Sequence, residues 1–187
     1  LSTKVNLSTF NNDCYQPVGS SLKRLLWYFC NAIFLNSSFF PICAFKVKLL
    51  RWFGASVGKG VVVKPKVNIK YPWKLAIGDH SWIGEGVWID NLAEVKIADN
   101  CCVSQGAMLL TGNHDFKKSS FDLMVGEITL HSGAWVGAKS IVCPGVTLYK
   151  NAVLAVGSVC STDLQENTIN RGNPSVFVKE RHIKQES

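Results

Sequence analysis

The chain has 187 residues, 47% of them hydrophobic and 18% charged, and its 20 Lys and Arg against 13 Asp and Glu give a formal net charge of +7. This length and apolar content support one sizeable core, which argues against disorder, and no apolar run reaches the roughly 18 residues of a membrane span. Seven cysteines without a C-x-x-C spacing disfavour a disulfide framework and a zinc ribbon, and favour reduced thiols in the cytoplasm. The surplus positive charge is compatible with nucleic acid, an anionic membrane or a phosphorylated substrate.

Residues 1–56 predict an N-terminal amphipathic helical cap. One helix is expected after Ser20 or Ser21, and a second from Pro41 to before Gly54. Their apolar stripes are Leu22, Leu25, Leu26, Phe29 and Ile33 in the first helix, and Ile42, Phe45, Leu49 and Trp52 in the second. The region holds six basic residues and one acid. Two interpretations stay open: a cap over exposed strand edges, or a cap that also contacts an anionic membrane peripherally.

From residue 57 to residue 165 an aliphatic side chain returns at every sixth position, with two slips of two residues and one longer break. The fourteen positions are Val57, Val63, Ile69, Ile77, Ile83, Ile89, Ile97, Val103, Leu109, Leu130, Val136, Val142, Leu148 and Leu154. A helix has a period of 3.6 and a simple strand a period of two, whereas a period of six suits the three short sides of an 18-residue triangular turn. The sequence therefore predicts a mainly β fold, a parallel β-helix of five turns over residues 57–165, with a short C-terminal tail over residues 166–187.

Corners must join the short sides of such a prism. Glycine directly follows the aliphatic position at Gly58, Gly78, Gly84 and Gly137. We expect these glycines at corners that need an unusual backbone conformation.

The repeat is interrupted after its third turn, and residues 115–129 are predicted to leave the column as an excursion loop. Long loops on rigid scaffolds often carry function. His114 stands where the loop departs, between Asn113 and Asp115. A neutral imidazole there can remove a proton from a hydroxyl group at physiological pH. The remaining histidines are predicted to be surface residues without a functional role: His80, His131 and His182.

Several motifs in the repeat resemble those of the hexapeptide-repeat acyltransferases. They are Thr-Gly-Asn-His-Asp at 111–115, Trp-Val-Gly at 135–137, Pro-Gly-Val-Thr at 144–147, Ala-Val-Gly-Ser-Val at 155–159 and Gly-Asn-Pro at 172–174. Within that family, Tyr-Pro-Trp-Lys-Leu at 71–75 and Arg-Gly-Asn-Pro at 171–174 resemble the colanic acid biosynthesis acetyltransferase branch, which also has a helical N-terminal segment. The resemblance covers nearly the whole chain.

The resemblance implies a left-handed β-helix, a homotrimer with active sites between neighbouring prisms, acetyl-CoA as co-substrate and no metal. It implies direct transfer of acetyl to a hydroxyl of a saccharide, or of a lipid-linked saccharide, in exopolysaccharide or capsule assembly. His114 would be the general base, and either Asn113 or Asp115 would orient its imidazole. The reduced thiols predict a location in the cytoplasm, and the basic cap leaves open a peripheral contact with the inner face of the plasma membrane.

The resemblance also assigns residues to the two substrates. Residues placed along the pantetheine channel of coenzyme A are Trp135, Gly137, Ala138, Val156, Gly157 and Ser161, and those placed near the cofactor's phosphates or the Gly-Asn-Pro turn are Arg171, Lys179 and Arg181. Arg171 departs from the wider family, which usually has Ala there. Gly84 occupies the neighbourhood where related sugar acetyltransferases often present Asn, and Trp82 beside it either stacks on a sugar ring or packs at a corner.

Three other functions compete with acetyl transfer. A γ-carbonic-anhydrase-like metal hydratase needs three histidines including a closely spaced pair, whereas His114 and His131 are 17 residues apart. A catalytically inactive β-helix scaffold stays open. Nucleic-acid binding is disfavoured, because the positive charge gathers in the predicted cap and no recognition motif is present.

Overall fold

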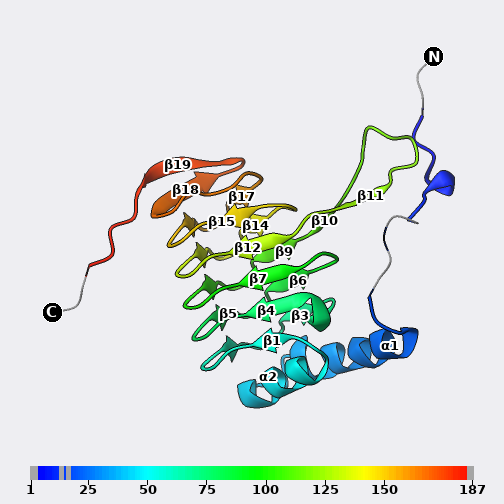
Figure 1. The fold of residues 1–187 in the computed structure, drawn as a ribbon, viewed down its shortest axis with the longest axis horizontal. Coiled ribbons are helices and arrows are strands. Elements are labelled where there is room, and N and C mark those ends of the chain that lie inside the picture. Colours follow the sequence, from blue (N-terminus) through cyan, green and yellow to red (C-terminus); the bar gives the residue numbers. More distant parts are fainter. Residues whose placement is uncertain (1–3, 13–14, 16–17, 185–187) are drawn as a thin grey trace.

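The structure is a computed structural model that describes residues 4–12, 15 and 18–184. Its main body is a three-sided column of short parallel strands, each stacked on the strand one turn earlier (Figure 1). Sheet A comprises β1 (Ser56–Val57), β4 (Leu75–Ile77), β7 (Val95–Ile97), β12 (Ile128–Leu130) and β15 (Thr147–Leu148). Sheet B comprises β2 (Val62–Val63), β5 (Trp82–Ile83), β8 (Cys102–Val103), β13 (Trp135–Val136), β16 (Val153–Leu154), β18 (Thr168–Gly172) and β19 (Ser175–Glu180). Sheet C comprises β3 (Asn68–Ile69), β6 (Trp88–Asp90), β9 (Met108–Leu110), β14 (Ile141–Val142) and β17 (Val159–Cys160).

The six-residue aliphatic period builds the core of this column. All fourteen predicted aliphatic positions lie in strands, and thirteen of them are buried, while Val57 in the first turn is half-buried. Each of these strands contributes at least one inward residue, so the aliphatic side chains of successive turns stack into a continuous interior. The predicted parallel β-helix is confirmed.

The corner glycines have a different cause from the one predicted. Gly58, Gly78, Gly84 and Gly137 do not adopt the left-handed conformation. Instead, the backbone of the next turn approaches so closely that a Cβ would collide with it: a Cβ on Gly84 would lie 2.6 Å from the Gln105 nitrogen. The expectation of an unusual backbone conformation was therefore wrong, and close packing of successive turns explains these glycines.

The C-terminal segment closes the top of the column. β18 continues sheet B by pairing in parallel with β16, and β19 returns antiparallel to β18. Residues predicted as a tail thus extend a sheet. Hexad periodicity did not reveal β19, because that strand reverses direction.

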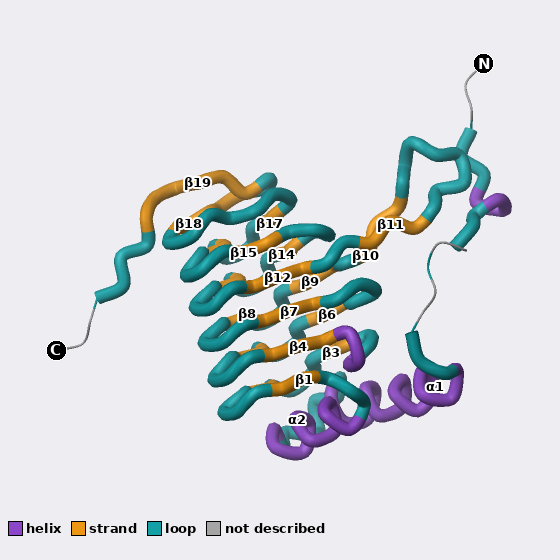
Figure 2. Tube along the Cα trace, viewed as in Figure 1, coloured by secondary structure: helices purple, strands orange, loops and turns teal. Residues whose placement is uncertain are grey.

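Helices form the foot of the column (Figure 2). α1 (Ser21–Cys30) begins after Ser20, whose side chain accepts a hydrogen bond from the Lys23 N–H, and it continues into a π-helical turn, η2 (Asn31–Leu35). α2 (Cys43–Trp52) follows, and two short 3₁₀ turns, η1 (Leu7–Thr9) and η3 (Pro72–Lys74), complete the helical elements. None of the helices in the described part of the chain has the length and apolar content needed to cross a membrane.

The helices attach to the column mainly through side chains outside the predicted apolar stripes. Trp27 of α1 is buried and its indole N–H donates to the Ile69 carbonyl, over 2.8 Å. In α2 the buried Lys46 ammonium donates to the Lys64 carbonyl, and burial lowers the pKa of Lys46. Leu49 of the predicted α2 stripe is buried, whereas Ile42 and Trp52 are exposed.

Candidate functional site

An antiparallel arm leaves the column after β9. Its two strands are β10 (Gly112–His114) and β11 (Leu123–Val125), with His114 opposite Leu123. The chain rejoins sheet A at Ile128, which pairs with Val95. In Figure 1 the arm projects from the side of the column opposite β18 and β19.

The His114 imidazole is held by the backbone of the arm. Its Nδ1 lies 2.9 Å from the Phe121 carbonyl oxygen. A carbonyl can only accept a hydrogen bond, so Nδ1 carries the proton and Nε2 keeps its lone pair. The imidazole also stacks on the Phe121 ring, with centroids 4.5 Å apart and planes 10° apart. The arm therefore presents a histidine in the tautomer that a general base needs.

The predicted orienting side chains make other contacts. The Asn113 Oδ1 accepts from the His114 backbone N–H, and the Asp115 Oδ1 accepts from the Lys117 backbone N–H. Both contacts shape the turn around His114, and the group that holds the ring is the Phe121 carbonyl. The sequence did not predict this contact, because the acceptor is a main-chain carbonyl seven residues away, and every residue has such a carbonyl.

Phe121 itself has a left-handed backbone conformation, with a φ of 54°. Such a conformation costs roughly 1–3 kcal/mol for a non-glycine residue and is common at functional sites. Nearby, the Lys118 ammonium lies 3.1 Å from the Asp122 carboxylate. Hydrogen bonds from Ser120 and Lys118 lower the pKa of Asp122. The loop is thus fixed on both sides of the carbonyl that meets His114.

The N-terminal segment lies against the same arm. The Asn6 N–H donates to the Ser119 carbonyl over 2.8 Å, and the Phe10 ring centroid lies 5.9 Å from that of His114. Phe10 was not predicted from sequence, because its distance along the chain from His114 hides the contact.

A second site lies on sheet B. A cavity of about 460 Å³, here called the sheet-B cavity, lies between the outward side chains of β13, β16 and β18. The predicted residues that line it are Trp135, Gly137, Ala138, Val156 and Arg181. The Trp135 indole N–H donates to the Ser104 hydroxyl, and Arg181 donates to the carbonyls of Gly133 and Asn151. The lining of the cavity is mostly apolar, which suits a pantetheine arm.

The other predicted cofactor residues lie outside this cavity. Gly157 follows Val156 at the next corner, where its φ of +66° favours glycine. Ser161 is exposed just after β17, while Arg171 and Lys179 are exposed on β18 and β19.

The predicted acceptor residues Trp82 and Gly84 line a groove of about 350 Å³, here called the sheet-B groove. This groove shares Ser104 and Gln105 with the sheet-B cavity above it. The two hollows therefore form neighbouring parts of one face.

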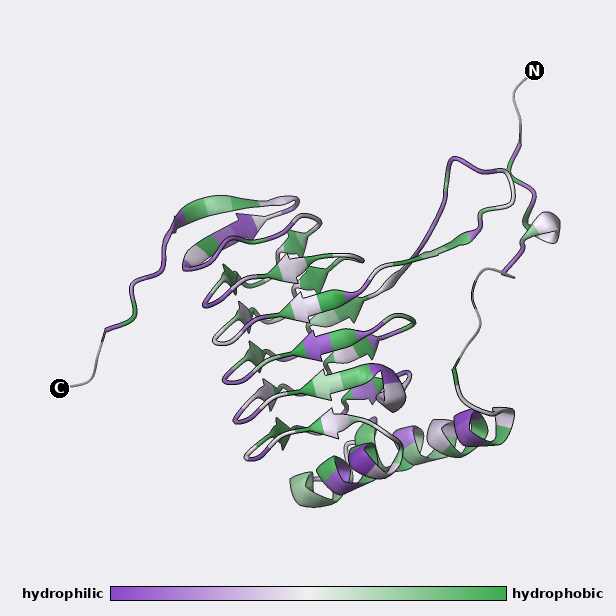
Figure 3. Ribbon diagram, viewed as in Figure 1, coloured by the Kyte–Doolittle hydropathy of each residue, from purple (hydrophilic) through white to green (hydrophobic). Residues whose placement is uncertain are grey.

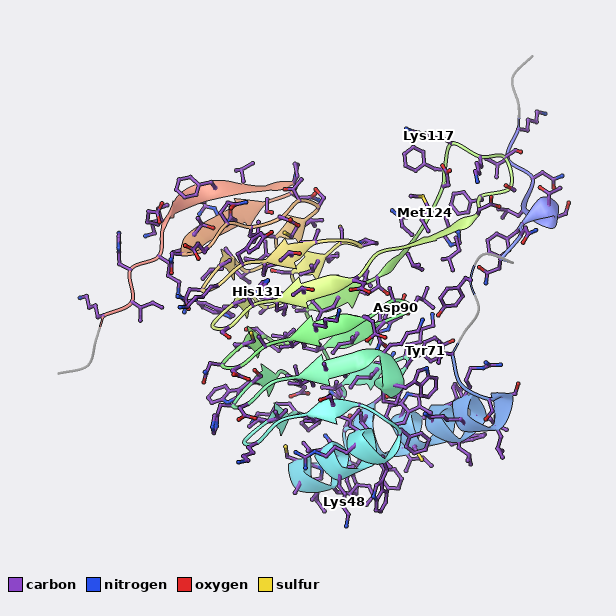
Figure 4. All side chains as sticks on the ribbon, in the orientation of Figure 1. Lys48, Tyr71, Asp90, Lys117, Met124 and His131 are labelled. Carbon is purple, nitrogen blue, oxygen red and sulfur yellow. The ribbon has the colours of Figure 1, made fainter. Side chains whose placement is uncertain are left out.

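Sequence reasoning did not find a third hollow, here called the sheet-C cavity. It measures about 570 Å³ and lies between α1 and sheet C, lined by Tyr28, Asn68, Lys70, Tyr71, Trp88 and Asp90 among others. The Asp90 carbonyl accepts hydrogen bonds from the backbone and hydroxyl of Thr111, just before the arm. Figure 4 shows Tyr71 and Asp90 on the side of the column from which the arm projects. Aromatic, amide and charged side chains together suit a polar ligand with apolar faces.

The thiols and potential metal ligands form no comparable site. Burial raises the pKa of both Cys101 and Cys160 to about 11, so these two are neutral thiols at physiological pH. Across the described residues, no three His, Cys, Asp or Glu side chains gather closely enough to hold a metal ion.

One chain does not bring these parts together. His114 projects on the arm that leaves sheet C, whereas the sheet-B cavity opens on a different face of the prism. The predicted base and the sheet-B cavity are thus positioned by different faces of the prism.

Comparison with known proteins identifies the family. No family model matches the chain. It is 36% identical over 163 residues to WcaF of Escherichia coli K12, a protein named as an acetyltransferase of colanic acid biosynthesis, covering 87% of this chain and 90% of that protein. Its fold matches a hexapeptide-repeat acetyltransferase of Vibrio cholerae complexed with acetyl-coenzyme A, with a TM-score of 0.81, 19% identity and coverage of 94% and 97%. It also matches a maltose O-acetyltransferase of Clostridium difficile, with a TM-score of 0.78, 22% identity and coverage of 88% and 90%.

These matches confirm the predicted fold class and the resemblance found in the motifs. The alignment to WcaF spans 87% of the chain, so it covers more than the hexads alone. The chain belongs to the hexapeptide-repeat acetyltransferases, in the branch represented by the colanic acid biosynthesis enzyme.

Proposed function

We propose that this enzyme transfers acetyl from acetyl-CoA to a hydroxyl group of a saccharide used in exopolysaccharide or capsule assembly. The observation that carries the proposal is the hydrogen bond between His114 Nδ1 and the Phe121 carbonyl, which leaves Nε2 free to accept a proton. The proposed location is the cytoplasm, which suits both acetyl-CoA as the acetyl donor and cysteines that remain reduced.

The reaction proceeds by direct transfer. His114 Nε2 takes the proton of the acceptor hydroxyl while the hydroxyl oxygen attacks the thioester carbonyl, and the Phe121 carbonyl stabilises the imidazolium that forms. The tetrahedral intermediate collapses by breaking the carbon–sulfur bond, and the imidazolium returns its proton to the departing thiolate. A backbone N–H is the donor we expect for the intermediate's oxyanion.

The acetyl-CoA pantetheine arm occupies the sheet-B cavity, against Trp135, Ala138 and Val156. Arg171 and Lys179 are exposed on the two strands that close the top of sheet B, where positive charge suits the cofactor's phosphates. Arg181 already donates to two backbone carbonyls and also lines the cavity, so it shapes the site in addition to carrying charge.

The working enzyme is a homotrimer whose active sites lie between neighbouring prisms. This arrangement is supported by the position of His114 and the sheet-B cavity on different faces of one prism. The arm of one protomer then reaches the cofactor held by the next, and each closed trimer has three equivalent sites.

The acceptor is proposed to bind between the sheet-B groove of one protomer and the sheet-C cavity of its neighbour. Trp88 in the cavity is partly exposed, and the cavity continues to Asp90, directly beneath the start of the arm. Trp82 supplies an exposed aromatic face on the other wall. Aromatic faces pack on the apolar face of a sugar while amides and charges bind its hydroxyls.

Replacing Trp88 with Ala is therefore expected to raise KM for the saccharide about tenfold, because one aromatic contact supplies roughly 1.5 kcal/mol. KM for acetyl-CoA should not change, since the sheet-B cavity lies elsewhere. The measurement is steady-state acetyl transfer on a panel of free and lipid-linked saccharides, with Trp82→Ala tested in parallel. If no saccharide accepts acetyl while acetyl-CoA still binds, the proposed substrate class is wrong.

Phe121 is a positioning residue for His114. Phe121→Gly keeps a residue suited to the φ of 54° but removes the stacked ring, so kcat should fall about tenfold with KM for acetyl-CoA unchanged. Phe121→Tyr retains the ring and should restore kcat. Phe116→Ala is the matched control, because Phe116 is exposed on the same arm. An unchanged kcat in Phe121→Gly would show that the stack does not position the base.

A further inference from the structure

The apolar stripe of the first helix faces away from the column. Its members, all between 50% and 64% exposed, are Leu22, Leu25, Leu26, Phe29 and Ile33. Trp27, on the opposite side of the same helix, is 2% exposed and anchors α1 to sheet C through Ile69. At 100° per residue the stripe falls on one helical face and Trp27 on the other. The fold therefore leaves a continuous helical apolar face without a partner from the described chain.

Further apolar side chains are exposed at the same foot of the column. Phe39 lies between the helices, Ile42 precedes α2 and Trp52 ends it, and each is more than half exposed. Figure 3 shows apolar segments along both helices, at the end opposite β18 and β19. The aromatic members are of the type that gathers at the boundary between lipid and water.

The charge around this face is of one sign. Between Asp13 and Asp79 the sequence has ten Lys and Arg and no Asp or Glu, whereas the rest of the chain has ten basic and thirteen acidic residues. Lys48 lies on α2 at the foot of the column (Figure 4), and Lys59 is exposed on the first turn. Acids of the second turn offset part of this charge through the pairs Lys66–Glu85 and Lys70–Asp90.

We propose that the helical foot, comprising α1, η2 and α2, docks on an anionic lipid bilayer, with the stripe of α1 inserted among the acyl chains. Apolar burial and attraction of basic side chains to acidic headgroups act together in such contacts. The same charge disfavours foot-to-foot contact with a second copy of this chain, because two cationic feet would repel each other. Docking sets the column upright on the bilayer.

Docking has a consequence for the sheet-C cavity. Tyr28 and Asn31, which line it, belong to the helical foot. The cavity therefore opens just above the proposed membrane surface, where a saccharide attached to a lipid would be presented. This consequence rests on the proposed function, whereas membrane docking itself does not.

The test is co-sedimentation of the full-length protein with vesicles of phosphatidylcholine, either pure or mixed with phosphatidylglycerol. We expect binding to the mixed vesicles, and at least about tenfold weaker binding when salt rises from about 0.1 M to about 1 M, which shortens the Debye length from about 10 Å to about 3 Å. Leu25→Glu with Phe29→Glu should lower binding by at least about tenfold. Both side chains are exposed, so the substitutions remove no core contact.

Ile183→Glu is the matched control, because it makes the same change at an exposed residue outside the foot and should leave binding intact. Lys48→Gln with Lys59→Gln should reduce binding only to the anionic vesicles.

Absent binding by the wild type, equal binding to pure phosphatidylcholine, or unchanged binding by the Leu25→Glu, Phe29→Glu variant would overturn the proposal. So would a smaller lipid-free assembly of that variant in analytical ultracentrifugation, because a second copy would then cover the face. Acetyl transfer to a free saccharide, measured on the same samples, separates failure of docking from failure of the proposed function.

Discussion

His114→Ala is expected to lower kcat for acetyl transfer by about 10²- to 10⁴-fold, the range that a positioned general base contributes. The reason is that His114 Nε2 is the basic atom that the Phe121 carbonyl leaves unprotonated. His114→Gln should be equally inactive, since an amide nitrogen is no base. The measurement is release of free coenzyme A thiol in the presence of an acceptor saccharide.

The same variants should bind acetyl-CoA as the wild type does, because the sheet-B cavity contains no part of the arm. Equilibrium binding of acetyl-CoA therefore controls for folding and for the donor site. Wild-type turnover by His114→Ala, with donor binding intact, would remove His114 from the mechanism. A catalytically inactive scaffold would show no turnover even in the wild type.

The column could be read from the sequence because its cause is local and repeated. Each of the fourteen aliphatic residues fills the same inward position, so one period fixes the placement of strands from Val57 to Leu154. His114 stood out for the same reason, since the repeat stops beside it. A break in a regular sequence pattern can be recognised without a three-dimensional structure.

Contacts between different elements of the fold could not be predicted from the repeat. The carbonyl of Phe121 reaches His114 through an arm hairpin, and the sheet-C cavity joins α1 to residues of the first and second turns of the column. Both depend on backbone positions rather than on residue type. The stripe of α1 illustrates a further limit, because periodicity reveals an amphipathic face but not what that face contacts.

The proposed arrangement of each active site between two protomers leads to a prediction about mixtures of inactive variants. Val156 is exposed and lines the sheet-B cavity, so Val156→Trp should fill part of that volume and raise KM for acetyl-CoA at least about tenfold without disturbing the core. Ile183→Trp, at an exposed residue outside the cavity, should leave KM unchanged. Val156→Trp and His114→Ala alone should each turn over poorly, because one lacks the donor site and the other the base.

Co-expression of the two variants should restore activity. In a mixed trimer, a protomer with His114 intact can stand beside a protomer with Val156 intact, and one such pair completes a site. Random assembly of equal amounts gives about one quarter of the wild-type number of sites in the whole mixture, and about one third in the isolated mixed trimers, because each mixed trimer has one complete site of three. The measurement is the initial rate per trimer at acetyl-CoA well below KM, with differently tagged chains so that mixed trimers are isolated. Activity no greater than the sum of the separate variants would place the base and the donor cavity on the same chain, and the arm would then have to fold back across sheet C to reach sheet B.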